Sequence, residues 1–137
     1  MVVYPKTNEL FVADGYGNQR VVVFDAETGK YKRHWGAYGN KPDDTVKLTR
    51  RAEGEGGKQF NLVHYVSISK DELVYVADRN NNRIQVFTLD GKFVKEGFVA
   101  RETGSTNGTV YSVIPSTDPQ QRFLYVADAA NGRIRIL

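Results

Sequence analysis

The chain has 137 residues, two histidines and no cysteine, and its 19 basic and 16 acidic residues leave a net charge of +3. This length suits one domain, and the lack of cysteine excludes a disulfide framework, a thiolate metal site and a cysteine nucleophile. The small, interleaved charge argues against a nucleic-acid partner. No apolar run approaches the roughly 20 residues of a membrane-spanning helix, and residues 1–6 lack the apolar core of a signal peptide. The sequence therefore predicts a soluble chain without a membrane partner and leaves its compartment open.

Three segments of the chain follow one pattern, at residues 9–24, 72–87 and 122–137. Each is an apolar run ending in Val-Ala-Asp, then a turn rich in Asn or Gly, then a second apolar run that begins with Arg. Val, Ile, Tyr and Phe dominate these runs, which last four to seven residues and stop at Asn, Gly or Asp. Short runs of this composition are typical of β-strands. Each segment therefore predicts two paired strands.

Further strands are expected on both sides of these segments. Before them lie apolar runs at 2–4, 64–68 and 110–114, and after the first two lie runs at 31–35 and 93–97. Residues 25–30 and 89–92 read as hairpin turns, with Gly where a positive φ is needed. The third repeat ends before its fourth strand, so eleven strands are expected in all. Repeated four-stranded units joined by short turns are typical of β-propeller blades.

We therefore expect an all-β domain of three four-stranded antiparallel blades, the last lacking its outer strand. The blades are placed at about 1–39, 59–101 and 108–137, with an inserted polar, glycine-rich loop at 40–58. Three blades make half of a six-bladed ring and leave open faces that invite association. The sequence favours a homodimer in which two half-rings close one ring, and the alternative is a fragment of a longer protein.

A family resemblance rests on four stretches of this sequence. They are Asp-Gly-Tyr-Gly-Asn-Gln-Arg at 14–20, Trp-Gly at 35–36, Phe-Asn-Leu-Val-His at 60–64, and Val-Ala-Asp-Arg-Asn-Asn-Asn-Arg-Ile-Gln at 76–85. These stretches resemble NHL repeats, which form six-bladed propellers. More narrowly, they are similar to bacterial NHL-repeat proteins related to the lyase half of peptidylglycine amidating enzymes.

The resemblance to the lyase implies roles for three residues of this chain. Tyr16 and Arg79 match residues that serve catalysis, and His64 matches one of three zinc ligands. Val63 stands where the family has proline, the blades that would carry the other two zinc histidines are absent, and His34 aligns with a position that is not a ligand. A catalytic zinc normally takes three protein ligands. His64 is therefore expected to bind a metal only if a partner chain completes the site.

The repeats separate architectural residues from candidate site residues. An Asp and an Arg recur in every copy, and we expect them to pair across each turn: Asp14 with Arg20, Asp78 with Arg83, and Asp128 with Arg133. Arg79 instead stands where the other copies carry Gly15 and Ala129, so the fold does not demand an arginine there. A guanidinium at the mouth of a propeller channel could hold a carboxylate through two hydrogen bonds.

Two functions follow as hypotheses. The first is a propeller scaffold that binds a ligand, peptide or protein at a ring face, without a cofactor and without enzymatic activity. The alternative is a zinc-dependent lyase that cleaves peptidyl-hydroxyglycine to an amide and glyoxylate. In that enzyme Tyr16 would take a proton and Arg79 would hold the carboxylate. The missing zinc ligands favour the scaffold.

Overall fold

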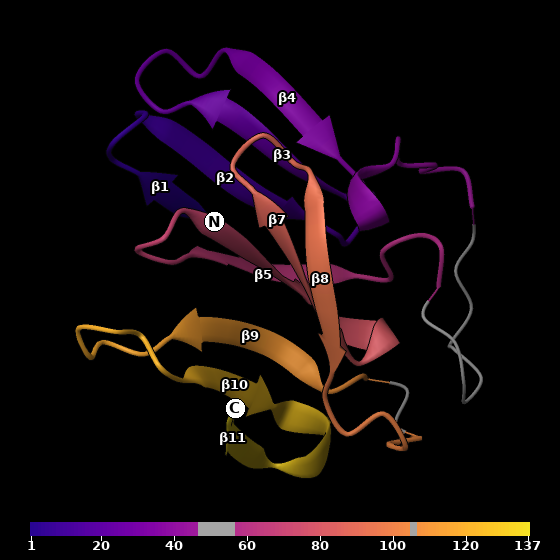
Figure 1. Ribbon diagram of the computed structural model, residues 1–137. Helices are drawn as coiled ribbons and strands as arrows, with labels where there is room; N and C mark the ends of the chain where they lie inside the picture. Colours follow the sequence, from indigo (N-terminus) through magenta and orange to yellow (C-terminus); the bar gives the residue numbers. More distant parts are fainter. Residues whose placement is uncertain (47–56, 105–106) are drawn as a thin grey trace.

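The computed structural model describes residues 1–46, 57–104 and 107–137, and these residues form three antiparallel β-sheets (Figure 1). Sheet 1 comprises β1 (Val2–Tyr4), β2 (Glu9–Asp14), β3 (Arg20–Asp25) and β4 (Tyr31–Trp35). Sheet 2 comprises β5 (Val63–Ile68), β6 (Leu73–Asp78), β7 (Arg83–Thr88) and β8 (Phe93–Phe98). Sheet 3 comprises β9 (Val110–Pro115), β10 (Leu124–Asp128) and β11 (Arg133–Ile136). Within each sheet, strands that follow one another in the chain are hydrogen-bonded neighbours.

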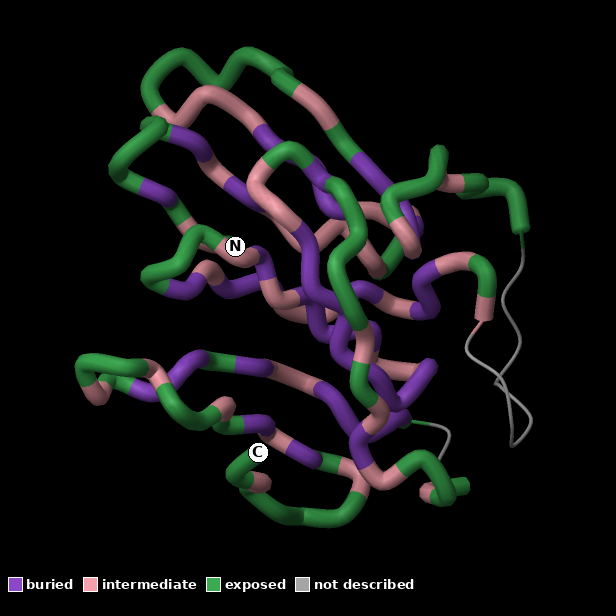
Figure 2. The backbone as a smooth tube through the Cα atoms, in the orientation of Figure 1, coloured by how far each residue is buried: buried purple, intermediate pink, exposed green. Residues whose placement is uncertain are grey.

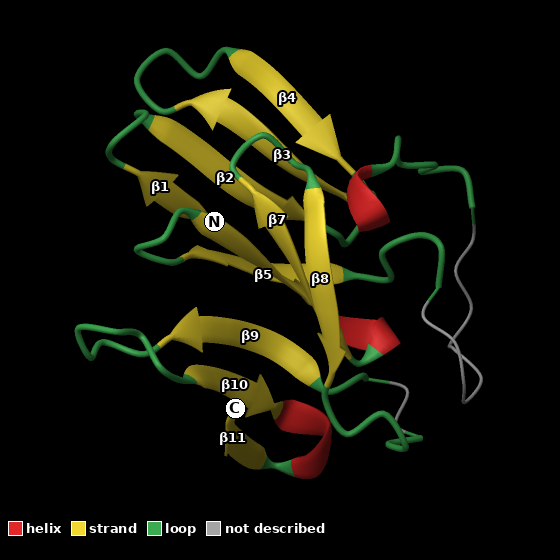
Figure 3. Ribbon diagram, viewed as in Figure 1, coloured by secondary structure: helices red, strands yellow, loops and turns green. Residues whose placement is uncertain are grey.

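The predicted all-β architecture is confirmed, and sheet 3 has three strands among the described residues. Strand 2–4 is found as predicted, and the strands expected at 64–68, 93–97 and 110–114 are each longer by one residue. The only helices in the described ranges are three short 3-10 turns: η1 (Ala37–Gly39), η2 (Arg79–Asn81) and η3 (Ala129–Asn131) (Figure 3). None of them is long and apolar enough to cross a membrane. Most of the insertion expected at 40–58 lies outside the described residues.

Sheet 2 lies between the other two sheets and forms a core with each of them (Figure 2). The larger core packs Phe11 and Trp35 of sheet 1 against Phe87 of sheet 2. The second core places Ile84 and Val86 of sheet 2 with Val113 and Val126 of sheet 3. Sheet 2 is therefore apolar on both faces, which is typical of a sheet that lies between two other layers.

The predicted Asp–Arg pairs are confirmed in the first two sheets. Arg20 Nε lies 2.9 Å from Asp14 Oδ2, and Arg83 Nε lies 2.6 Å from Asp78 Oδ2. The third pairing was wrong, because Asp128 is bound by Arg135 at 2.6 Å and Arg133 is exposed. Residues two apart on a strand share one face, so Arg135 reaches the same side of β11 as Arg133. These pairs fix the turns and are architectural.

Glu9 supplies a pH-dependent part of the stability. It is 5% exposed and accepts two hydrogen bonds of 2.7 Å from Arg33, which lower the pKa of its carboxyl from 4.5 to about 2. A lowered folded-state pKa stabilises the fold above pH 4.5, and this contribution is lost as the pH falls toward 2. We expect unfolding in urea at pH 7 and pH 3 to reveal a loss of about 2 kcal/mol from this group.

The variant Glu9→Gln tests this assignment. It should be less stable than the native chain at pH 7, and it should lose less stability between pH 7 and pH 3. Glu27→Gln, in an exposed turn, is the matched control and should behave as the native chain does. An unchanged pH dependence in Glu9→Gln would assign the effect to other carboxylates.

Candidate functional site

The three predicted site residues lie at one end of the sheets. Tyr16 is in the turn after β2, Arg79 begins the turn after β6, and His64 is the second residue of β5. The carboxyl ends of β2 and β6 and the amino end of β5 meet at this end because neighbouring strands are antiparallel. The 3-10 turns follow β4, β6 and β10 at the same end of the sheets; in Figure 3 η1 and η2 lie at the right and η3 lies at the lower middle. We call this end of the sheets the loop end.

Tyr16 of sheet 1 lies beside His64 of sheet 2. Their ring centroids are 6.0 Å apart, and Tyr16 is 80% exposed. Gly15 makes this approach possible, since a Cβ at that position would lie 2.1 Å from the carbonyl oxygen of Val63. The turn of sheet 1 therefore packs directly on the start of β5 and brings a tyrosine hydroxyl and an imidazole to one surface.

His64 is oriented by Tyr111, the second residue of β9. The Nδ1 atom of His64 lies 2.6 Å from the carbonyl oxygen of Tyr111, and the two rings are 4.9 Å apart. A carbonyl can only accept a hydrogen bond, so Nδ1 carries the proton in the neutral ring. That tautomer leaves Nε2 with a lone pair, able to accept a hydrogen bond or to bind a metal.

Arg79 contacts both the ring and the hydroxyl of Tyr111. Its guanidinium carbon lies 4.0 Å from the centroid of the Tyr111 ring, and its Nη2 donates to the Tyr111 hydroxyl at 2.6 Å. Its Nε donates to the carbonyl oxygen of Asn107 at 2.6 Å. Of the five guanidinium N–H groups, two are thus engaged among the described residues. The other three N–H groups have no hydrogen-bond partner in the part of the chain that the structure describes.

These contacts make a continuous surface from Tyr16 through His64 and Tyr111 to Arg79, which we call the loop-end cluster. Its one permanent charge is the half-buried Arg79 guanidinium, which Tyr111 and Asn107 hold in a fixed orientation. An aromatic surface with a fixed guanidinium suits a ligand that has a carboxylate and a flat or apolar body. The structure therefore brings the three predicted residues together on a common surface.

Sequence reasoning missed Tyr111. Strand register places it at the position in sheet 3 that His64 holds in sheet 2, because Val63 pairs with Asp78 as Val110 pairs with Asp128. An alignment of the three inner strands would have revealed it. The cluster therefore repeats one contact, in which the turn of one sheet meets the second residue of the next inner strand.

A zinc site at the loop-end cluster would need protein ligands in addition to His64. His64 offers Nε2, but no group of three or more His, Asp or Glu side chains gathers as a metal site anywhere in the described part of the chain. His34 does not help, since it lies on the outer strand β4 with its Nδ1 2.8 Å from the Tyr31 hydroxyl. One imidazole does not make up the three protein ligands of a catalytic zinc. The described residues therefore do not fit a complete zinc site.

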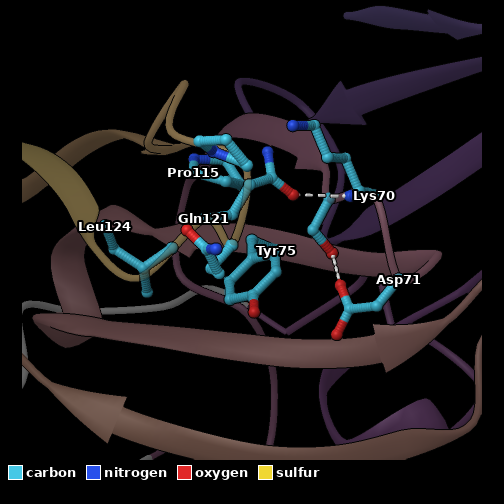
Figure 4. Close-up of a pocket in the computed structure, with 9 residues that line it drawn as sticks. Lys70, Asp71, Tyr75, Pro115, Gln121 and Leu124 are labelled. Atoms are coloured by element: carbon cyan, nitrogen blue, oxygen red, sulfur yellow. Dashed lines mark hydrogen bonds between the residues drawn. The ribbon is translucent and has the colours of Figure 1, made fainter.

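A separate cleft of about 350 Å³ lies between sheets 2 and 3 at the opposite end of the strands (Figure 4). It is bordered by the β5–β6 and β9–β10 turns, and Gln121 of one turn accepts a hydrogen bond from the backbone N–H of Lys70 in the other at 2.6 Å. Tyr75 and Leu124 supply apolar surface. None of the predicted site residues lines this cleft, so it is independent of the loop-end cluster.

Fold and site together define a protein built from repeated antiparallel β-blades whose turns carry a polar and aromatic surface. A model of the NHL repeat matches residues 60–87, which begin three residues before β5 and include most of β7. The central sheet therefore carries an NHL repeat, and the match covers β5, β6 and most of β7.

Several named proteins are similar to this chain. Peptidylglycine alpha-amidating monooxygenase of Rattus norvegicus is 37% identical over 101 residues, which cover 70% of this chain and 9% of that protein. A probable peptidyl-alpha-hydroxyglycine alpha-amidating lyase of Caenorhabditis elegans is 33% identical over 88 residues, which cover 64% of this chain and 21% of that protein. NHL repeat-containing protein 3 of Mus musculus is 31% identical over 86 residues, which cover 61% of this chain and 20% of that protein. The chain thus spans about a tenth to a fifth of the length of these relatives.

Proposed function

We propose that this chain is a β-propeller-type binding scaffold, that two copies assemble as half-rings, and that the loop-end cluster binds a ligand with a carboxylate, such as the end of a peptide. The ligand-binding proposal rests on how Arg79 is held. Tyr111 and the Asn107 carbonyl hold its guanidinium, and its other three N–H groups have no hydrogen-bond partner among the described residues. The fold alone does not require an arginine at this turn, because the equivalent residues are Gly15 and Ala129.

The surroundings of Arg79 favour a carboxylate over other anions. A guanidinium binds a carboxylate through two parallel hydrogen bonds, and the rings of Tyr111, His64 and Tyr16 continue the surface beyond the charge. Those rings offer stacking area and a few further polar groups, among them the Tyr16 hydroxyl and His64 Nε2. A small carboxylate with an attached amide, as in a peptide end, matches this mixture of one charge and a flat apolar surface.

Binding of N-acetylglycine, measured by calorimetry, tests the assignment. We expect Arg79→Ala to weaken binding by about 10-fold to 100-fold, since a hydrogen bond to a charged group contributes about 1.5–3 kcal/mol. Lys30→Ala removes the same charge from an exposed turn at the opposite end of sheet 1 and should bind as the native chain does. Equal affinities for the two variants would contradict a binding role for Arg79.

A second candidate function is an amidating lyase, which the names of the relatives favour. On that proposal Arg79 would hold the carboxylate of peptidyl-hydroxyglycine, and the exposed Tyr16 hydroxyl would exchange a proton with the substrate. His64 would supply one zinc ligand, and a partner chain would have to complete the set. Because the described residues do not form that set, no step is assigned to the metal.

Glyoxylate release from a peptidyl-hydroxyglycine distinguishes the two functions. The scaffold proposal expects no release above the uncatalysed rate when zinc is supplied. Release that falls at least tenfold in Tyr16→Phe and in Arg79→Ala, with Lys30→Ala unaffected, would favour the lyase.

A further inference from the structure

One face of sheet 3 is apolar and uncovered. Strand register places Ile114, Tyr125 and Ile136 in one row across the sheet, with Ile134 on the same face. Ile134 is 71% exposed, Ile136 is 65% exposed, and Ile114 and Tyr125 are 44% and 39% exposed. We call these four residues the uncovered face of sheet 3. Apolar exposure of this extent along one sheet face is typical of an interaction site.

The same repeat positions are buried in the other two sheets. Val21 and Val23 are 0% exposed, and Ile84 and Val86 are 4% exposed. They occupy the positions of Ile134 and Ile136, counted from the Arg that opens each strand. In sheets 1 and 2 the following sheet covers this face. The uncovered face of sheet 3 is therefore built to receive another sheet of the same kind.

Sheet 1 offers a matching face on its other side. Its outward residues include Val3, Leu10 and Phe24, which strand register places in one row. Val74 and Phe87 hold the equivalents of Leu10 and Phe24 in sheet 2, where both are fully buried against sheet 1. Val3 is 52% exposed. The outward face of sheet 1 is therefore the kind of surface that a preceding sheet covers within this chain.

We infer that the uncovered face of sheet 3 in one copy packs on the outward face of sheet 1 in a second copy, and that a two-fold axis forms this contact twice. The contact repeats the packing of sheet 2 on sheet 3, in which Ile84 and Val86 meet Val113 and Val126. Two copies bring together six sheets, within the four to eight blades of closed propellers. This inference rests on the half-ring assembly of the proposed function and identifies its surfaces.

A head-to-tail contact of this kind differs from one between two identical faces. If sheet 3 packed on sheet 3 of the second copy, the outward face of sheet 1 would stay exposed in the dimer. Further copies could then add to the assembly at that face. With sheet 3 on sheet 1, both faces are covered and the assembly closes at two copies. Variants that disable one face at a time therefore distinguish the two arrangements.

The experiment is molar mass in solution by sedimentation equilibrium. The native chain should behave as a dimer of about 31 kDa, twice the 15.4 kDa of one copy. The double variant Ile134→Asp and Ile136→Asp should be a monomer, and so should Val3→Lys. All these positions are more than half exposed in one copy, so the variants should keep the native circular dichroism. Val94→Asp, on the outer strand β8 and 46% exposed, is the control and should remain a dimer.

Mixing the two monomeric variants tests the pairing of faces. The mixture retains one native contact and opposes Asp to Lys in the other, so it should form a heterodimer that neither variant forms alone. A native monomer would overturn the inference, and so would a dimer that Val3→Lys leaves intact. Binding of N-acetylglycine is scored separately, because the loop-end cluster lies within one copy. A monomer with Arg79-dependent binding would contradict the assembly alone.

Discussion

Replacing Arg83 with Ala should destabilise the chain by about 3–5 kcal/mol, the range expected when one partner of a buried ion pair is removed. Arg83 and Asp78 are both 0% exposed. Burial raises the pKa of the Asp78 carboxyl, and donors from Arg83, Asn81 and the backbone N–H of Asn61 at 2.6–2.8 Å offset that cost. Without Arg83, the carboxyl loses its only ion-pair partner among the described residues.

The loss also extends beyond the ion pair. Arg83 donates to the Tyr38 hydroxyl at 2.7 Å and to the carbonyl oxygen of Gly57 at 2.8 Å, so it joins sheet 2 to the segment that follows sheet 1 and the segment that precedes β5. Urea unfolding measures the change. Lys92→Ala removes a cation from an ion pair whose side chains are 79% and 59% exposed, and should change stability by less than about 0.5 kcal/mol. Similar losses in both variants would contradict a structural role for the buried pair.

Gly15→Ala should cost about 3 kcal/mol and disturb the loop-end cluster, because the added methyl group meets backbone. Its Cβ would lie 2.1 Å from the carbonyl oxygen and 2.3 Å from the nitrogen of Val63. Overpacking usually costs about 1–3 kcal/mol, and a backbone strand cannot turn aside as a side chain can. The turn that carries Tyr16 must therefore move away from β5 and from His64.

Gly17→Ala is the matched control, two residues further along the same turn. A Cβ there has no atom within 4 Å, and the backbone of Gly17 is not left-handed. The variant should be within about 0.5 kcal/mol of the native chain. Thermal unfolding compares the two variants. Equal stability would contradict the close packing of the turn on β5.

The fold could be predicted because the strand and turn patterns of each segment agree with the repeat along the whole chain. Three copies of the Val-Ala-Asp pattern, each followed by a strand that begins with Arg, predicted the strands, the turns and the Asp–Arg pairs of sheets 1 and 2. The predicted pairing of Asp128 with Arg133 is wrong at β11, which is the edge strand of sheet 3 among the described residues. Arg135, two residues later, takes its place. The repeats therefore predict which strands pair. They do not predict which of two arginines on one face of a strand binds the aspartate.

The site could be predicted only in part. Tyr16, His64 and Arg79 stood out from the family resemblance, and Arg79 also from its departure from the other repeats. Their contacts depend on how one blade packs on the next, which no local pattern contains. Tyr111 sits in a strand that reads as ordinary core sequence, yet it holds both His64 and Arg79. Its role arises from the packing of sheet 3 on sheet 2.

The central claim is that the loop-end cluster is a ligand site, and the ring signals of the two histidines in NMR spectra test it most directly. During titration with N-acetylglycine, the signals of His64 should shift and saturate, because its ring lies between Tyr16 and Tyr111. Those of His34, on the outer strand beside Tyr31, should stay unchanged and serve as a control within the same molecule. If His64 does not respond at saturating concentration, or if both histidines shift alike, the cluster is not the binding site.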